Sequence, residues 1–131
     1  MPLFPIVRDA ATASFLDACE RGEFPLVRDV ATGTILDPKT DISSDPERYE
    51  VFNASGAATV ISWSEAPGTA GIGSPTSILF GIVELAEGPW WWTELHTNRP
   101  LSQLTGSAAR LAFIKTGPEP HHATVPYFII D

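Results

Sequence analysis

The feature of this sequence that most constrains its fold is the segment at residues 80–96, FGIVELAEGPWWWTELH. Residues 78–85 form a β-type run, residues 87–89 (EGP) predict a turn, and residues 90–96 return as the second arm of a hairpin. Gly81 lies inside the first arm, where a glycine commonly marks a bulge or a barrel corner. The segment therefore predicts two paired strands of a β-rich protein.

Three consecutive tryptophans, Trp90, Trp91 and Trp92, begin the second arm of this hairpin. Because side chains alternate along a strand, Trp90 and Trp92 are predicted to point to one face and Trp91 to the other. We therefore expect at least one indole to face solvent or to be covered by a partner. Large aromatic side chains are enriched at interface hot spots, which favours a partner or ligand surface. The alternative is that the N-terminal helix and the loops bury all three.

The rest of the pattern predicts a mainly β protein with one short helix. A length of 131 residues fits a single domain, and 12 prolines with 10 glycines indicate short elements joined by turns. A helix is expected over residues 12–21, ending at Gly22. The further strands are expected at residues 24–28, 33–36, 49–52, 57–64, 108–115 and 123–130. About five principal strands after Tyr49 favour a small closed barrel, which has no exposed strand edges, over a β-sandwich.

The charge balance limits the partners that the chain can bind. Eight lysines and arginines against 16 acidic residues give a formal net charge of −8 at pH 7. Nucleic acids are bound largely through basic side chains that displace counterions, so a nucleic-acid partner is disfavoured, as is an anionic membrane surface. The chain has one cysteine, Cys19, and neither a signal peptide nor a membrane span is expected. We therefore expect a cytoplasmic protein.

Four motifs, in this order, resemble those of the DUF35 OB-fold proteins. They are SFLDACERG at residues 14–22, GAATVISW at 56–63, FGIVELAEGP at 80–89 and PYF at 126–128. The resemblance implies a mainly β fold with a five-stranded OB-fold barrel over residues 49–131. An N-terminal arm, a helix and a ribbon segment are implied over residues 1–48. The resemblance also implies a place beside thiolase-like or lipid-transfer-protein-type enzymes of acyl-CoA metabolism.

The ribbon segment of that family carries two C-x-x-C pairs for zinc, and this chain lacks them. Asp29 and Thr32 stand at the first pair, with Asp41 and Ser44 as counterparts of the second. Structural zinc in such sites needs thiolates or imidazoles, which carboxylates and hydroxyls do not replace. We therefore predict a degenerate ribbon without zinc, held by packing alone.

No group of residues in the sequence predicts an active site. Glu94 and His96 lie at i and i+2, on one face of a strand, and could share a site, whereas the adjacent His121 and His122 should point apart on an extended chain. Cys19, on the apolar face of the helix, is expected to be buried. We find no nucleophile with a neighbouring base, and we predict no catalytic residue, no metal and no cofactor.

The expected function is that of a non-catalytic accessory subunit. It would form a hetero-oligomer with a thiolase-like enzyme or a lipid-transfer-protein-type aldolase and support that enzyme's acyl-CoA site. The expected partner or ligand surface comprises Phe15, Trp90, Trp91, Trp92, Glu94 and His96. Single-stranded nucleic-acid binding is the alternative, because aromatic side chains of OB folds can stack on bases. A small enzyme that uses His96 and Glu94 is a third hypothesis.

Overall fold

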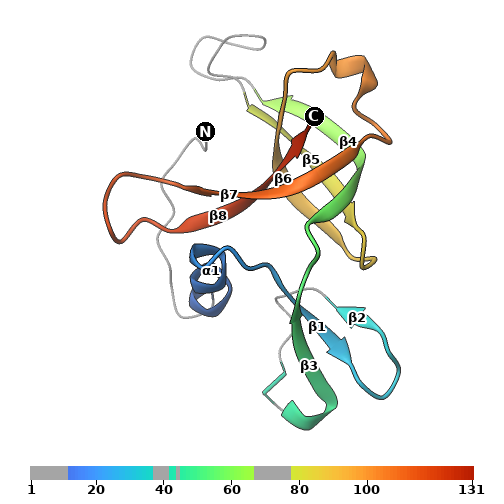
Figure 1. The fold of residues 1–131 in the computed structure, drawn as a ribbon, viewed down its shortest axis with the longest axis vertical. Coiled ribbons are helices and arrows are strands. Elements are labelled where there is room, and N and C mark those ends of the chain that lie inside the picture. The colour runs from blue at the N-terminus through green and yellow to red at the C-terminus, as the bar shows by residue number, and fades with distance from the viewer. Residues whose placement is uncertain (1–11, 37–41, 44, 67–77) are drawn as a thin grey trace.

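The structure, a computed structural model, describes residues 12–36, 42–43, 45–66 and 78–131, so most of the expected N-terminal arm, Asp41 and Ser44 lie outside the described residues. Its elements are α1 (Ala13–Glu20), β1 (Pro25–Asp29), β2 (Ile35–Leu36), η1 (Pro46–Arg48), β3 (Tyr49–Asn53), β4 (Ala57–Ala66), β5 (Ile78–Leu85), β6 (Trp90–Thr97), η2 (Leu101–Gln103), β7 (Ala108–Lys115) and β8 (Thr124–Ile130). Figure 1 shows α1 beside a barrel of strands, from which a small sheet projects. The expected mainly β fold with an N-terminal helix is confirmed. Among the described residues, no helix is long and apolar enough to cross a membrane.

Five strands form a closed barrel in the order β4-β5-β6-β8-β7. Four neighbouring pairs are antiparallel, and β6 and β8 run parallel. The short helix η2 lies in the connection between β6 and β7. A closed five-stranded barrel with this strand order and one parallel pair is the arrangement of an OB fold. The predicted barrel is therefore confirmed.

A β-bulge and a glycine shape the contact between β4 and β5. The register of the two strands shifts between Val60 and Ser62, and Gly81 of β5 stands opposite Trp63. A methyl group at Gly81 would collide with the Ser62 carbonyl oxygen and would lie 2.9 Å from the Trp63 Cα atom. The glycine therefore allows the two backbones to approach closely at the bulge.

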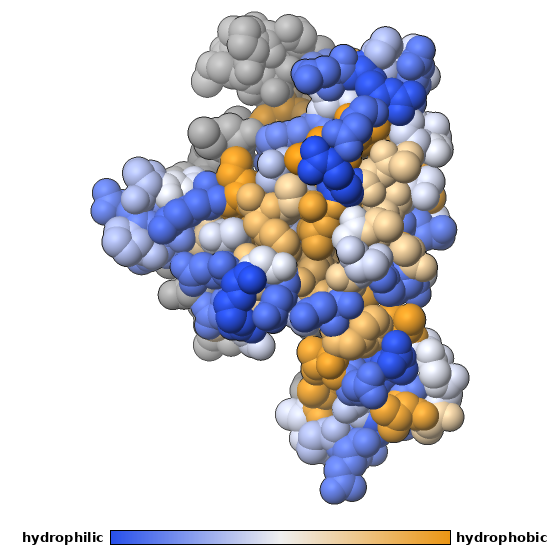
Figure 2. Space-filling view, in the orientation of Figure 1, coloured by the Kyte–Doolittle hydropathy of each residue, from blue (hydrophilic) through white to orange (hydrophobic). Residues whose placement is uncertain are grey.

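The remaining strands form a separate three-stranded sheet in the order β2-β1-β3. We expected residues 49–52 to belong to the barrel, and this is wrong, because β3 pairs along the whole length of β1, with Phe52 opposite Leu26. The barrel strands begin at β4, while the division of the chain into two domains at residue 48 stays a prediction. Figure 2 shows hydrophobic side chains on the surface of this projecting sheet, and Val51 is 56% exposed.

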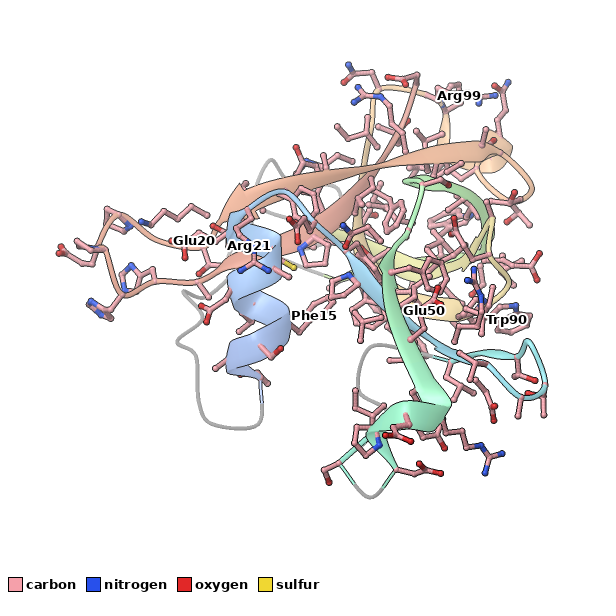
Figure 3. The ribbon with its side chains drawn as sticks, turned by 60° about the horizontal axis from the view of Figure 1, so that its bottom comes forward. Phe15, Glu20, Arg21, Glu50, Trp90 and Arg99 are labelled. Carbon is pink, nitrogen blue, oxygen red and sulfur yellow. The ribbon has the colours of Figure 1, made fainter. Side chains whose placement is uncertain are left out.

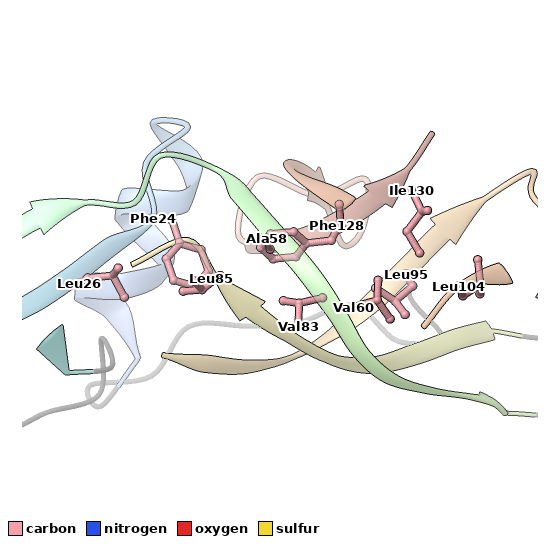
Figure 4. Close-up of a cluster of buried hydrophobic side chains, with 11 residues drawn as sticks. Phe24, Leu26, Ala58, Val60, Val83, Leu85, Leu95, Leu104, Phe128 and Ile130 are labelled. Carbon is pink, nitrogen blue, oxygen red and sulfur yellow. The ribbon is translucent and has the colours of Figure 1, made fainter. Parts of the chain in front are cut away.

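One apolar core joins the small sheet to the barrel (Figure 4). Phe24, directly before β1, and Leu26, within β1, belong to the same buried cluster as the inward side chains of the barrel. Leu104, directly after η2, also belongs to this cluster, and the barrel strands contribute Ala58, Val60, Val83, Leu85, Leu95, Ala109, Phe128 and Ile130. The small sheet is therefore anchored to the barrel through β1.

The helix α1 has a well-defined C-terminal end. Gly22 has a φ of +76°, and the amides of Gly22 and Glu23 donate to the carbonyls of Cys19 and Ala18, each at 2.9 Å. These two bonds form a Schellman motif, so the predicted stop at Gly22 is confirmed. The helix packs against β8 and buries Leu16.

The Cys19 thiol lies in the buried side of α1, as predicted. Burial raises its pKa to about 12, because the thiolate would be poorly solvated there. The thiol is therefore protonated near neutral pH and is a packing group rather than a nucleophile.

Candidate partner-binding face

The outward side chains of β5 and β6 form one continuous surface. The register places Phe80 opposite Glu94, Ile82 opposite Trp92 and Glu84 opposite Trp90, so the paired side chains share a face. We call this surface the outer β5–β6 face; its residues are Phe80, Ile82, Glu84, Trp90, Trp92, Glu94 and His96. β5 and β6 are the second and third strands of the barrel, and the face of these strands is where OB folds bind ligands.

Two tryptophans dominate the outer β5–β6 face. Trp90 is 57% exposed and Trp92 is 69% exposed, which confirms the predicted alternation along β6. Figure 3 shows Trp90 at the periphery of the molecule. The indole nitrogen of Trp90 donates a hydrogen bond of 3.0 Å to Glu84 Oε2. This hydrogen bond restricts the orientation of the Trp90 ring on the outer β5–β6 face.

Trp91 and Phe15 lie in a different environment, which we call the inner aromatic cluster and which is completed by Phe24. The Trp91 ring centroid lies 5.4 Å from that of Phe15 and 4.9 Å from that of Phe24, and the two phenylalanine centroids lie 5.3 Å apart. Figure 3 shows Phe15 on the side of α1 that faces the strands. Both residues are also partly exposed, so their expected place on a partner surface stays a prediction. The cluster ties α1 and β1 to the barrel.

Glu94 and His96 form a pair at the far end of the outer β5–β6 face. His96 Nε2 and Glu94 Oε1 lie 2.9 Å apart, as the i, i+2 spacing predicted. The His96 ring also packs on Tyr127 of β8, with 4.4 Å between ring centroids. Sequence reasoning did not find Tyr127, because β6 and β8 are distant in the chain and meet only in the closed barrel. These contacts gather a carboxylate, an imidazole and a phenol ring at one end of the face, and by themselves they define no reaction.

The loop between β7 and β8 contains the two adjacent histidines. Their ring centroids lie 4.5 Å apart, so the expectation that His121 and His122 point apart is wrong. The reason is the tight loop: His122 Nδ1 accepts a hydrogen bond of 3.1 Å from the Glu119 amide, and its ring packs against Gly117. In the part of the chain that the structure describes, no group of three or more His, Cys, Asp or Glu side chains could hold a metal ion.

The residues at the first ribbon metal position do not fit zinc. Asp29 Oδ1 accepts a hydrogen bond of 2.9 Å from the Ala31 amide, and Oδ2 accepts one of 3.0 Å from Arg48 Nε. The Thr32 hydroxyl donates to the Thr34 hydroxyl at 2.9 Å. Zinc requires thiolate, imidazole or free carboxylate ligands, whereas here both carboxylate oxygens are engaged and one faces a cation. Packing alone was expected to hold this segment, and this is wrong, because an ion pair contributes as well.

Because of the Asp29 carboxylate, the free energy of unfolding is predicted to depend on pH in the acidic range. The hydrogen bond from Arg48 holds the pKa of Asp29 below its usual range in the folded protein. A carboxyl with a lowered folded-state pKa stabilises the fold above its unfolded value, about 3.9, and loses this effect as the pH falls through the lowered value. We therefore expect the destabilisation caused by Asp29→Asn to be constant above about pH 5 and to shrink below about pH 4.

Urea denaturation of the Asp29→Asn variant and of the unmodified protein between pH 2.5 and 7 measures this effect. Asp131→Asn is the matched control, because Asp131 pairs with Arg110 on the surface and its pKa is also lowered. Its effect on the free energy of unfolding should be smaller at every pH, since exposed pairs contribute little. A destabilisation by Asp29→Asn that stays the same across the whole pH range would contradict the prediction.

The fold and the exposed face together define a class: an OB-fold protein that carries an N-terminal helix, a three-stranded sheet and an aromatic outer face. No family model and no curated protein matches the sequence. Among solved structures, 99% of this chain is similar to 98% of a chain of the Ltp2-ChsH2(DUF35) aldolase, with a TM-score of 0.72 and 20% sequence identity. At that identity the likeness shows the fold. It confirms, over the whole chain, the resemblance to the DUF35 OB-fold proteins.

Proposed function

We propose that this protein is a non-catalytic accessory subunit of a thiolase-like enzyme or a lipid-transfer-protein-type aldolase. The observation that carries the proposal is the likeness of the whole chain to a chain of the Ltp2-ChsH2(DUF35) aldolase. A match over 99% of this chain includes its helix and its small sheet as well as the barrel. The outer β5–β6 face supports the same function, because two exposed indoles on a small protein are typical of a surface that a partner covers.

Charge indicates what kind of surface covers the outer β5–β6 face. No lysine or arginine occurs in β5 or β6, whereas Glu84 and Glu94 both lie on the face. A single-stranded nucleic acid would need basic groups here for its phosphates, so the exposed indoles favour a protein surface instead. Because acidic and basic surfaces attract each other, the proposed partner presents lysine or arginine side chains opposite Glu84, within reach of the Trp90 and Trp92 rings.

The role of the subunit in the proposed complex is structural. It binds the enzyme as a hetero-oligomer and supports the acyl-CoA site from outside the reacting atoms. The Glu94–His96 pair lies on the proposed interface, where it would contribute polar contacts at the rim. The single cysteine leaves the chain without an internal disulfide, which agrees with a cytoplasmic complex.

Association with the enzyme tests the proposal directly. We expect the chain, expressed together with a thiolase-like enzyme or a lipid-transfer-protein-type aldolase, to elute with that enzyme in size-exclusion chromatography. Trp92→Ala should weaken the association by about 30-fold or more, because truncating an interface hot spot costs roughly 2 kcal/mol. Isothermal titration calorimetry measures the dissociation constants, and circular dichroism checks that the variant is folded.

Val51→Ala is the matched control for Trp92→Ala. Val51 is also exposed and apolar, but it lies on the small sheet rather than on the barrel. We expect the control to bind with unchanged affinity, and an affinity that Trp92→Ala leaves unchanged would place the interface elsewhere. Two independently eluting proteins would overturn the accessory function itself. Tight, salt-dependent binding of a single-stranded oligonucleotide would favour the alternative.

A further inference from the structure

The turn between β1 and β2 is closed by a small network around Asp29. The Asp29 amide donates to the Thr34 carbonyl at 2.8 Å, and the Gly33 amide donates to the Asp29 carbonyl at 2.7 Å. The side chain adds the bond from the Ala31 amide to Oδ1. Gly33 has a φ of +76°, which suits this tight turn. The turn therefore has a fixed shape, and the Asp29 side chain is only 8% exposed.

Arg48 connects this turn to the segment that precedes β3. Its Nε and Nη2 atoms lie 3.0 Å and 2.8 Å from Asp29 Oδ2, and its carbonyl accepts a hydrogen bond of 2.8 Å from the Val30 amide. Arg48 is the last residue of η1, four positions after Ser44 in the sequence. The turn with Asp29 and Thr32 is where the first ribbon ligand pair would lie. The ion pair therefore links the first ligand position to Arg48, which follows the second ligand position by four residues.

We propose that the Asp29–Arg48 ion pair replaces a zinc ion as the cross-link of the three-stranded sheet, so that this sheet needs no metal to fold. The guanidinium group supplies the positive charge that a metal would bring, and it occupies one oxygen of the carboxylate. A second cation at the same carboxylate would be repelled by Arg48. The chemistry of the two side chains supports the same conclusion, because the Asp29 carboxylate and the Thr32 hydroxyl, at the first ligand pair, make a poor zinc site. The sheet is thereby independent of both zinc supply and thiol oxidation.

Amide hydrogen exchange in the full-length protein tests this cross-link locally. In the Arg48→Gln variant we expect the amides of Val30, Ala31 and Gly33 to exchange at least about 10-fold faster, because the nearly buried Asp29 carboxylate loses its partner. Amides of the barrel core, such as Val60 and Val83, should keep their protection and show that the fold persists. Arg48→Lys, which keeps the charge but not the paired donors, should give a smaller increase and serves if Arg48→Gln does not fold.

Arg110→Gln is the matched control, since Arg110 forms a two-bond pair with Asp131 that is exposed on both sides. We expect it to leave exchange in the small sheet unchanged. The double variant Asp29→Asn with Arg48→Gln should exchange no faster than Arg48→Gln alone, because the two residues act as one pair. Equal exchange rates in Arg48→Gln and in the unmodified protein would overturn the proposal. So would stoichiometric zinc in the purified protein whose removal by a chelator exposes these amides.

Discussion

Replacing Phe24 with alanine is expected to lower the free energy of unfolding by about 3–5 kcal/mol, the usual cost of truncating a buried phenylalanine. Phe24 is 1% exposed and belongs to both the apolar core and the inner aromatic cluster. Its removal would leave a cavity where α1, β1 and β6 meet, and Phe15 and Trp91 would each lose their contact with the Phe24 ring. Because a domain of this kind has a total stability of about 5–15 kcal/mol, the variant should lose a large part of it.

Urea denaturation and calorimetry measure the effect of Phe24→Ala, with a fall in melting temperature of roughly 10–20 °C expected. Val51→Ala removes apolar atoms from an exposed position of the neighbouring strand and should change stability by no more than about 0.5 kcal/mol. A loss below about 1 kcal/mol in Phe24→Ala would show that the small sheet and the barrel do not depend on this shared core.

The second large effect is expected for Gly81→Ala. The added methyl group would meet the Ser62 carbonyl oxygen and the Trp63 Cα atom, which are backbone atoms of the bulged strand β4 and cannot rotate away. The two strands would have to separate at the bulge, and we expect a loss of about 3 kcal/mol or more, at the upper end of the cost of overpacking. Chemical denaturation measures it.

Ser64→Ala is a suitable control for Gly81→Ala, because Ser64 lies on the same pair of strands but its side chain is exposed. It should change the free energy of unfolding by no more than about 0.5 kcal/mol. If Gly81→Ala were as mild as this control, the close approach of β4 and β5 would not limit the residue at position 81.

The features that sequence reasoning predicted well are those that a strand or helix sets by itself. Alternation along β6 separates Trp91 from Trp90 and Trp92, and this depends only on the period of a strand. The end of α1 at Gly22 likewise follows from the conformational freedom of one residue. The candidate face could therefore be predicted in outline from its own short segment.

The features that it missed depend on contacts between distant segments. The residues of β3 have the same local pattern whether they pair with β1 or with a barrel strand, so the sheet to which they belong could not be read from them. Asp29 and Arg48 are 19 positions apart, and nothing in the intervening sequence marks them as partners. Gly81 did indicate a bulge, but the extra residue lies in the facing strand β4, which only the register reveals.

The different surroundings of the tryptophans have a spectroscopic consequence. Indole fluorescence shifts to longer wavelength in water, and dissolved quenchers reach only exposed rings. Trp90 and Trp92 should therefore dominate the red, iodide-sensitive part of the emission. The protected blue part should come from Trp91, packed on Phe15 and Phe24, and from Trp63, which is partly buried against the apolar core. A partner that covers the outer β5–β6 face would shift the red component to the blue and shield it from iodide. Binding can thus be followed with the protein's own fluorophores, without a label.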